Sequence, residues 1–339
     1  MLSFRMERPE PLTFAPLPDR AYAELLSQAH PDSPVSEDDL ARIAAGRQKD
    51  EHFTREGAFE GRTAVGAVQT GVPRMDAHDG WLDLTVTTAE PDPQLAGALL
   101  RRGLTTLAQA GAHTAVTRVQ EHWWDHGFLL AQGWREFDRM WLSTLDLRTL
   151  DFAAFATEEA RALAGGVTIR PLSDLGGWDG EPERHYALIH ALLSDVPSRE
   201  PIVVWPYELW RTRMAALNPD PRGLMIALSP DGEWIGTSQL AQPIPTHPGM
   251  LHNGLTGVLP AWRGRGLGLA LKLAAARAAL ARGFTHSRTG NHAINRPMLG
   301  INERLGFVRE AALVTLVTGV REAGRRAQKQ QDAPDTDFG

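Results

Sequence analysis

Residues 256–268 read Thr256-Gly257-Val258-Leu259-Pro260-Ala261-Trp262-Arg263-Gly264-Arg265-Gly266-Leu267-Gly268. An apolar, β-like run ends in this stretch, a loop rich in glycine and arginine follows, and a helix-forming segment begins at Leu267. Glycines let a backbone approach a ligand closely, successive N–H groups form a concave anion site, and the positive end of a helix attracts negative charge. The stretch therefore predicts a phosphate-binding loop, to which Arg263 and Arg265 can add charge-assisted contacts.

The spacing of the glycines distinguishes this loop from two common nucleotide-binding loops. A P-loop requires Lys and then Ser or Thr after its last glycine, but Leu269 and Ala270 follow Gly268. A dinucleotide-binding fingerprint requires Gly-x-Gly-x-x-Gly, whereas here the glycines alternate at 264, 266 and 268. The pattern disfavours both of these nucleotide-binding families.

A second segment lies downstream and reads Asn295-Arg-Pro-Met298-Leu-Gly-Ile-Asn302-Glu-Arg-Leu305-Gly306-Phe307. Together the two segments resemble the GNAT superfamily of N-acetyltransferases. Arg263, Gly266 and Gly268 match the family's pyrophosphate-loop motif, Gln/Arg-x-x-Gly-x-Gly/Ala. Asn295, Gly306 and Phe307 coincide with its downstream pattern, Asn-x-x-Ala-x-x-x-Tyr-x-x-x-Gly-Phe. The close resemblance covers residues 234–317.

This resemblance implies an α+β fold, a mixed twisted sheet flanked by helices, in which two parallel strands part to admit acetyl-CoA. The cofactor arm would pair with the strand near Val258 and Leu259, and Asn295 would approach it beside the thioester. A substrate amine would attack the acyl carbonyl directly, with a backbone N–H polarising its oxygen and no metal involved. The implied cofactor-binding residues are Val258, Leu259, Arg263, Gly264, Arg265, Gly266, Leu267, Gly268 and Asn295.

The residues that would handle protons depart from the family pattern. Asn302 stands where many members carry a tyrosine as general acid, and an amide can hydrogen-bond the leaving thiolate but cannot protonate it. His252 is the candidate base, because strand alternation without a bulge puts it on the same side as Val258 and histidine titrates near neutral pH. A surface histidine near a turn is the alternative interpretation of His252. His292 is a second candidate base.

Matches between the two halves of the chain predict an internal duplication. Residues 12–17 resemble residues 167–172 at an offset of 155, and Gly111 pairs with Gly283 at an offset of 172. The change of offset predicts an insertion of about fifteen residues early in the second copy, for which residues 194–206 are the natural place. Helix-forming segments are expected at residues 31–47, 94–110, 151–163 and 267–282, and strand-like runs at 63–70, 81–87, 234–240 and 251–259.

The long helix expected at residues 267–282 carries an apolar stripe, and Lys272, Arg277 and Arg282 lie elsewhere on it. Its stripe is formed by Leu267, Leu271, Ala274 and Ala278.

The first copy lacks the loop residues of the second. Pro91, Gln94 and Ala96 stand where Arg263, Gly266 and Gly268 would be, and the neighbouring Glu90 and Asp92 would repel a pyrophosphate. We therefore expect no cofactor in the first copy. The expected organisation is a degenerate GNAT domain at 1–150, a linker at 151–166, a GNAT domain with the acetyl-CoA site at 167–320, and a polar tail, as frayed helix or disorder, at 321–339.

Composition limits the functional classes. The chain has 339 residues, 42% of them apolar and 22% charged, with a net charge of −6, so a role in coating nucleic acid is not expected. Cysteine is absent, which excludes disulfides, a thiolate nucleophile and thiolate metal ligands. No apolar run is long enough to span a membrane, and residues 1–11 do not read as a secretory signal. A cytoplasmic protein, monomeric or homodimeric, is the expectation.

The sequence therefore favours an N-acetyltransferase that acts on the amine of a small molecule. Tandem copies with one degenerate half also resemble mycothiol-synthase-like enzymes. A non-catalytic acyl-CoA-binding or regulatory protein is the alternative, motivated by the missing tyrosine, and a peptide amine is a third possible acceptor. Residues 201–210, rich in aromatic side chains, either line the acceptor cleft or pack in the core.

Overall fold

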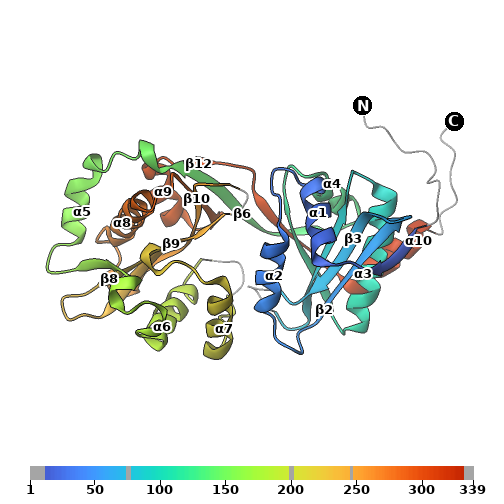
Figure 1. The fold of residues 1–339 in the computed structure, drawn as a ribbon, viewed down its shortest axis with the longest axis horizontal. Helices are drawn as coiled ribbons and strands as arrows, with labels where there is room; N and C mark the ends of the chain where they lie inside the picture. The colour runs from blue at the N-terminus through green and yellow to red at the C-terminus, as the bar shows by residue number, and fades with distance from the viewer. Residues whose placement is uncertain (1–11, 74–77, 198–201, 245–246, 332–339) are drawn as a thin grey trace. The chain divides into compact units, whose positions relative to one another are not determined.

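The computed structural model describes residues 12–73, 78–197, 202–244 and 247–331, which divide into two compact units (Figure 1). Unit 1 comprises Met1–Arg139 and Leu313–Gly339, and unit 2 comprises Met140–Ala312. The expectations for residues 1–11, for residues 198–201 of the expected insertion and for residues 332–339 of the tail lie outside the described residues.

Unit 1 is a mixed sheet with helices on both faces. Its strand order is β1-β2-β3-β4-β5-β13, in which β4 and β5 are parallel and the other neighbours are antiparallel. On β3, Ala67 packs with the apolar side chains of α1 and α2, whereas the next residue, Val68, faces Gly103 of α3. The elements are β1 Thr13–Pro16, α1 Asp19–Ala29, α2 Glu37–Ala45, β2 Phe53–Glu60, β3 Thr63–Gly71, β4 Trp81–Thr88, α3 Pro93–Gln109, β5 Thr114–Gln120, α4 Trp124–Ala131, β13 Leu313–Gly319 and α10 Val320–Gln331.

Unit 2 repeats this plan with the strand order β7-β8-β9-β10-β11-β6, and β10 and β11 are its parallel pair. Alternation along β8 sends Leu224 and Ile226 toward α6 and sends Met225 and Ala227 toward α8, so both faces of the sheet are buried. The elements are β6 Arg135–Asp146, α5 Ala156–Ala162, β7 Thr168–Pro171, α6 Pro182–Leu193, α7 Tyr207–Leu217, β8 Leu224–Leu228, β9 Trp234–Pro243, β10 Met250–Val258, α8 Leu267–Ala281, β11 His286–His292, α9 Arg296–Leu305 and β12 Val308–Arg309, with short 3-10 turns between them.

The observed helices and strands confirm the expected segments to within a few residues. Ser36 caps α2 through a capping box with Asp39, as its place before three acidic residues indicates. Gly111 and Gly283 follow α3 and α8 at φ +80° and +85°, the left-handed conformation for which glycine is favoured after a helix.

The long helix α8 differs from its expected form. Leu267 and Leu271 are buried as predicted, but Ala274 and Ala278 are only partly buried, and burial extends around most of the helix. The prediction that Lys272 lies away from the apolar side is wrong, because its side chain is inside the core. The reason is that α5, α9 and the end of β6 cover faces of α8 that a simple two-layer packing would leave open.

The last strand of each sequence repeat completes the sheet of the other unit. Residues 140–146 of β6 pair with β11 in unit 2, and β13 pairs along its whole length with β5 in unit 1. The compact units therefore differ from the continuous segments 1–150 and 167–320 that the repeat indicates, because each sheet takes its sixth strand from the other repeat.

Two further segments differ from their expected roles. The expected linker, residues 151–166, contains α5, which contributes Ala162 to the core of unit 2 and pairs Glu159 with Arg277 of α8 at 2.5 Å. The expected polar tail begins as α10, a helix that packs on α3 and buries Val320 and Ala323. A few buried apolar residues on one face are enough to fix a helix whose average composition is polar.

The extra residues of the second repeat are divided between two places. Ten residues, 172–181, separate β7 from α6, where two residues separate β1 from α1. The remainder lies between α6 and β8, the region that includes the expected insertion. The single insertion that the offsets indicate is thus wrong in detail, because the segment 172–181 folds into two 3-10 turns of its own.

Two absences concern the described residues alone. None of the described helices is long and apolar enough to cross a membrane. The described part of the chain also contains no group of three His, Asp or Glu side chains placed to hold a metal ion.

Helix α6 contributes a buried histidine, His185, to an aromatic part of the core. The His185 ring is 2% exposed, it packs against Trp178, Trp210 and Trp234, and neither ring nitrogen has a hydrogen-bond partner among the described residues. Burial lowers the pKa of His185 to about 4, because the charged ring would have no water or acceptor to solvate it.

Replacing His185 should remove much of the protein's acid sensitivity. Between pH 6.5 and 4 the unfolded chain binds a proton at this ring and the folded chain does not, so stability falls by up to about 3 kcal/mol as the pH drops. We expect His185→Phe to abolish this loss in urea denaturation measured from pH 7.5 to 4. The matched control is His190→Phe, an exposed position on the same helix, which should leave the pH dependence unchanged. An unaltered pH dependence in His185→Phe would contradict the assignment.

Candidate active site

The loop before α8 presents a row of free N–H groups. Gly264 and Gly266 have φ of +74° and +84°, and Gly266 is the N-cap residue of α8, with no side-chain cap. Among the hydrogen bonds of the described residues, none uses the backbone N–H of residues 264–268. These residues are exposed except for Leu267, which is buried, and Gly268, which is partly so. Five consecutive N–H donors at a helix N-terminus are a ready site for an anion.

The two loop arginines have different surroundings. Arg263 donates from Nε to the carbonyl of Val258 at 2.9 Å, and its guanidinium forms an ion pair with Asp195, just beyond the end of α6. Arg265 lies over the Trp262 ring at 4.6 Å and donates weakly to the carbonyl of Ala261. Arg263 therefore fixes the loop to the end of β10, and the Asp195 carboxylate partly neutralises its positive charge.

The parallel strands β10 and β11 part in the middle of the sheet. They pair from Met250 and His286 as far as Asn253 and Thr289, and beyond that point the edge of β10 has no partner on β11. The N–H of Leu259 is donated to the carbonyl of Ile235 on β9, so this group does not face the open edge. The available backbone of β10 is accordingly the stretch before Leu259, residues 254–258.

Asn253 lies at the position where β10 and β11 separate, which we call the branch point. Its carbonyl accepts from the Thr289 hydroxyl at 3.1 Å, and its side-chain N–H donates to the carbonyl of Gln239 on β9 at 2.9 Å. Its side-chain oxygen accepts from the Nζ of Lys272 on α8. Register shifts on both sides of Asn253 show that the strand bulges here. Side chains and backbone thus tie β9, β11 and α8 to one residue.

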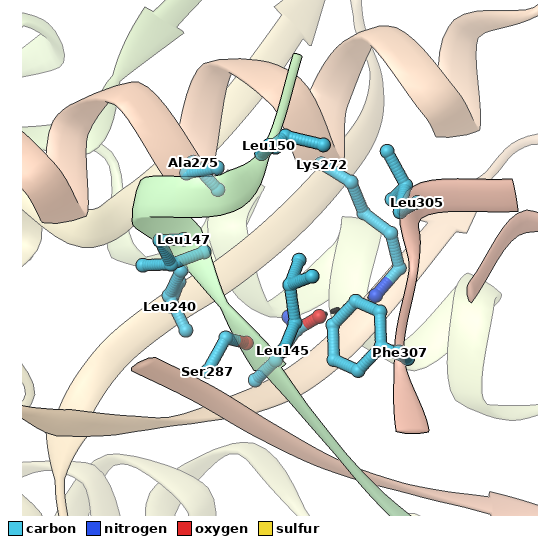
Figure 2. A pocket seen from close by; sticks show the side chains of 11 residues that line it. Leu145, Leu147, Leu150, Leu240, Lys272, Ala275, Ser287, Leu305 and Phe307 are labelled. Atoms are coloured by element: carbon cyan, nitrogen blue, oxygen red, sulfur yellow. Dashed lines mark hydrogen bonds between the residues drawn. The ribbon is translucent and has the colours of Figure 1, made fainter. Parts of the chain in front are cut away.

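Lys272 is buried in an apolar cavity behind this branch point. Its side chain is 5% exposed, and its Nζ lies 5.1 Å from the centre of the Phe307 ring (Figure 2). The cavity, about 10 Å³, has room for about one water molecule. Burial lowers the pKa of Lys272 to about 7, since the surroundings solvate the ammonium poorly. The cavity is lined by Leu145, Leu147, Leu150, Leu240, Asn253, Lys272, Ala275, Ala276, Ser287, Leu305 and Phe307.

His252 precedes the branch point and is exposed. The strand bulges between His252 and Thr256, so simple alternation no longer puts His252 on the side of Val258, which is buried. In register, His252 stands opposite Arg288 of β11. Desolvation by the surrounding protein and the Arg288 charge lower the pKa of His252, which keeps its ring neutral at pH 7.

The three downstream polar residues have structural partners. Asn302 is 3% exposed and donates from its amide to the Asn291 side chain at 2.6 Å, near the end of β11. Asn295 caps α9 by accepting from the N–H of Met298. His292 accepts the N–H of Ile294 at its Nδ1. These contacts shape the end of β11 and the start of α9 beside the parted strands.

Comparison with known proteins bears on this geometry. Residues 186–307 match the model of the acetyltransferase (GNAT) family. This segment is therefore similar in sequence to the GNAT family. It contains the parted strands, the loop and the downstream residues described above.

Solved structures extend the likeness in fold to most of the chain. A GCN5-related N-acetyltransferase from Sphaerobacter thermophilus is 18% identical, with a TM-score of 0.68 over 92% of this chain and 96% of that one. A tandem GNAT protein from the clavulanic acid biosynthesis pathway is 17% identical, with a TM-score of 0.68 over 91% of this chain and 99% of that one.

A GCN5-related glucosamine N-acetyltransferase region of a fungal GH3 β-N-acetylglucosaminidase is 16% identical, with a TM-score of 0.66 over 92% of this chain and 38% of that one. No curated protein matches the sequence. The tandem GNAT fold expected from the sequence is confirmed.

The equivalent loop of unit 1 differs from the GNAT loop of unit 2 in its donors. Asp92 caps α3 and accepts the N–H of Leu95 at 2.9 Å, and Pro93, the first residue of the helix, has no N–H. A carboxylate therefore occupies the helix end that is open in unit 2. This contact supports the expectation that a pyrophosphate would be repelled from unit 1.

The aromatic segment before α7 contributes partly to the core. Trp210 is buried against Trp178 and His185, as the core-packing interpretation has it. Tyr207 donates its hydroxyl to Glu183 at 2.9 Å, and Val203 remains exposed.

Sequence reasoning missed Lys272, Asn253 and Asp195. A signal for Lys272 was present, because it stands inside the apolar run Leu269-Ala-Leu-Lys-Leu-Ala274 and is one of only three lysines among 35 basic residues. Asp195 carries no comparable signal, since an ion pair across 68 residues depends on how α6 packs.

Removing the buried amine should stabilise the fold and flatten its alkaline pH dependence. Between about pH 7 and 10.5 the unfolded chain holds a proton at Lys272 that the folded chain releases, so wild-type stability rises with pH in this window. We expect Lys272→Met to be more stable by about 1–4 kcal/mol at pH 7, and to lose that rise. Chemical denaturation at pH 6.5, 8 and 9.5 checks this, with the exposed Lys49→Met as the matched control. A less stable variant at pH 7 would show that the Asn253 contact outweighs the cost of burial.

Proposed function

We propose that unit 2 transfers an acetyl group from acetyl-CoA to the amine of a small molecule. The observation that carries this proposal is the row of unpartnered N–H groups at residues 264–268, placed next to the parted strands β10 and β11. The donors suit a pyrophosphate, and the open edge of β10 suits an extended arm that pairs with backbone.

Particular residues would hold the cofactor. The N–H groups of Gly264, Arg265, Gly266, Leu267 and Gly268 would bind the pyrophosphate, with the Arg263 and Arg265 guanidinium groups beside it. Residues 254–258 would receive the arm through their free backbone groups, and Val258 ends this stretch. Leu259 would help to shape the turn beside the cofactor and would not donate to the arm, because its N–H already donates to the carbonyl of Ile235.

The chemistry needs an acceptor amine that has lost its proton. Acetyl-CoA supplies a thioester whose carbonyl carbon the amine attacks, so that a C–N bond forms and the C–S bond breaks. We assign His252 as the base that takes the amine's proton, directly or through water, because its lowered pKa favours the neutral ring, which can accept a proton.

The buried Asn302 amide supports Asn291 and protonates nothing, so the leaving thiolate takes its proton from water. The absence of an acid here is tolerable because a thiolate is a stable leaving group. A non-catalytic acyl-CoA-binding protein is the second candidate, and it is favoured by this same asparagine.

Turnover separates the two candidates. Release of CoA thiol from acetyl-CoA can be followed with a thiol reagent, and the chain adds no background because it has no cysteine. The amines to be offered include hexosamines, since one similar structure is described as a glucosamine N-acetyltransferase region, together with polyamines and short peptides. Thiol release with none of them would favour the binding protein.

Changing the loop should abolish cofactor binding. We expect acetyl-CoA to bind the wild type in calorimetric titration, and Gly266→Glu with Arg263→Ala to weaken binding by at least about 100-fold, because a negative side chain is added beside the backbone donors and a charge-assisted contact is lost. Gly283→Glu is the matched control, because Gly283 has the same left-handed φ at the other end of α8 and open space around it. Equal losses in both glycine variants would point to strain rather than to the loop.

Removing the competing carboxylate should strengthen binding. Asp195 forms an ion pair with Arg263, and an exposed ion pair is worth about 0.2–1 kcal/mol. We expect Asp195→Asn to bind acetyl-CoA about 2- to 5-fold more tightly, with the gain shrinking at high salt. Asp231→Asn, an exposed residue in the β8–β9 turn, makes the same charge change and should have no effect. Weaker binding by Asp195→Asn would mean that Asp195 orients Arg263 for the cofactor.

A further inference from the structure

Lys272 is an unusual use of a lysine in this chain. The sequence has three lysines among its 35 Lys and Arg residues, and one of the three is fully enclosed in the core of unit 2. Arginine stays charged at every accessible pH, whereas a buried lysine can be neutral. A core position that needed only volume would be filled by an apolar side chain, at a lower free-energy cost.

The surroundings of the amine give it a defined hydrogen bond. The eleven side chains that line its cavity include no carboxylate, histidine or arginine, so no neighbouring charge in the cavity compensates the ammonium. The Nζ lies beside the Phe307 ring (Figure 2) and donates to the Asn253 side-chain oxygen. The contacts direct the amine to Asn253.

Asn253 in turn controls where the strands part. Its backbone and side chain bond to Thr289 on β11 and to Gln239 on β9, and it is the last residue of β10 in register with β11. The bulge that follows sets the direction of residues 254–258, the part of β10 that is not paired with β11. A displaced Asn253 would change the direction of that edge.

Lys272 also belongs to the helix that begins with the anion-binding loop. It lies in the second turn of α8, which starts at Leu267. One side chain therefore connects the helix whose N-terminus would hold the pyrophosphate to the strand that would present the thioester.

We propose that Lys272 is a positioning residue that fixes, through Asn253, the parting of β10 from β11 and so the placement of the acyl group. The proposal rests on the proposed function. The Lys272 amine donates to Asn253 on β10, so we expect it to act on the thioester end of the cofactor and to leave the pyrophosphate end unaffected. A small displacement of the backbone N–H that would polarise the thioester carbonyl should slow the reaction strongly. The same displacement should change the affinity for the distant phosphates little.

The decisive measurement compares CoA and acetyl-CoA in wild type and Lys272→Met. Methionine matches the length and volume of the chain and lacks the donor. We expect Lys272→Met to bind CoA within about 3-fold of wild type, to lose any preference for acetyl-CoA over CoA, and to lower kcat by at least about 10-fold with KM for acetyl-CoA little changed. Amide hydrogen exchange at residues 254–258 should be faster in the variant. Thermal denaturation confirms that the variant is folded.

Two controls make the result specific to the amine. Lys49→Met changes an exposed lysine of unit 1 and should leave every value unchanged. Lys272→Cys supplies the chain's single thiol, which can be alkylated with 2-bromoethylamine in denaturant to restore an amine and then refolded. Alkylated Lys272→Cys should regain most of the acetyl-CoA preference and of kcat relative to wild type treated in the same way.

The possible failures are distinguishable. If the wild type binds neither CoA nor acetyl-CoA, the proposed function is overturned and this proposal falls with it. If the wild type binds both and Lys272→Met keeps the same ratio of affinities and the same kcat, the function stands and the positioning role is overturned. Failure of the restored amine to recover activity would also overturn the role.

Discussion

The structure of unit 2 depends on the point at which two parallel strands separate. Up to Asn253 and Thr289 the strands β10 and β11 satisfy one another's backbone groups, and beyond it they do not. A buried sheet does not leave backbone donors and acceptors unpaired without a partner or solvent. The bulge in β10 and the side-chain hydrogen bonds of Asn253 make the separation a defined feature of the fold. The open edge, the loop that follows and the helix α8 are all placed by it.

The exchange of terminal strands gives each unit a dependence on the other half of the sequence. Without β6, unit 2 would lack the neighbour of β11, and without β13, unit 1 would lack the neighbour of β5. An unpaired strand edge exposes a row of backbone groups and invites aggregation. The degenerate repeat therefore has a structural role, because its last strand completes the sheet that carries the candidate site.

The two repeats differ in whether the N-terminus of the corresponding helix is capped by a side chain. In unit 2 the N-cap of α8 is a glycine with no capping side chain, and its first N–H groups have no hydrogen-bond partner among the described residues. In unit 1 the corresponding helix α3 begins with Asp92 and Pro93, which respectively satisfy and remove those donors. A capped helix is locally more stable, and an uncapped one keeps its donors for a ligand. A few side chains thus separate a binding loop from a structural turn on the same backbone plan.

The sequence by itself determined the local features: the loop at 256–268, the glycines that need positive φ, the helix and strand segments, the duplication and the family. These follow from residue types within a few positions of one another, where backbone sterics and periodicity act directly. Only the tertiary structure decided which repeat each final strand joins, that α5 belongs to the core, that a bulge interrupts the alternation between His252 and Val258, and that Lys272 is buried at the branch point. Those outcomes depend on contacts between residues far apart in the chain, which periodicity along a single segment does not encode.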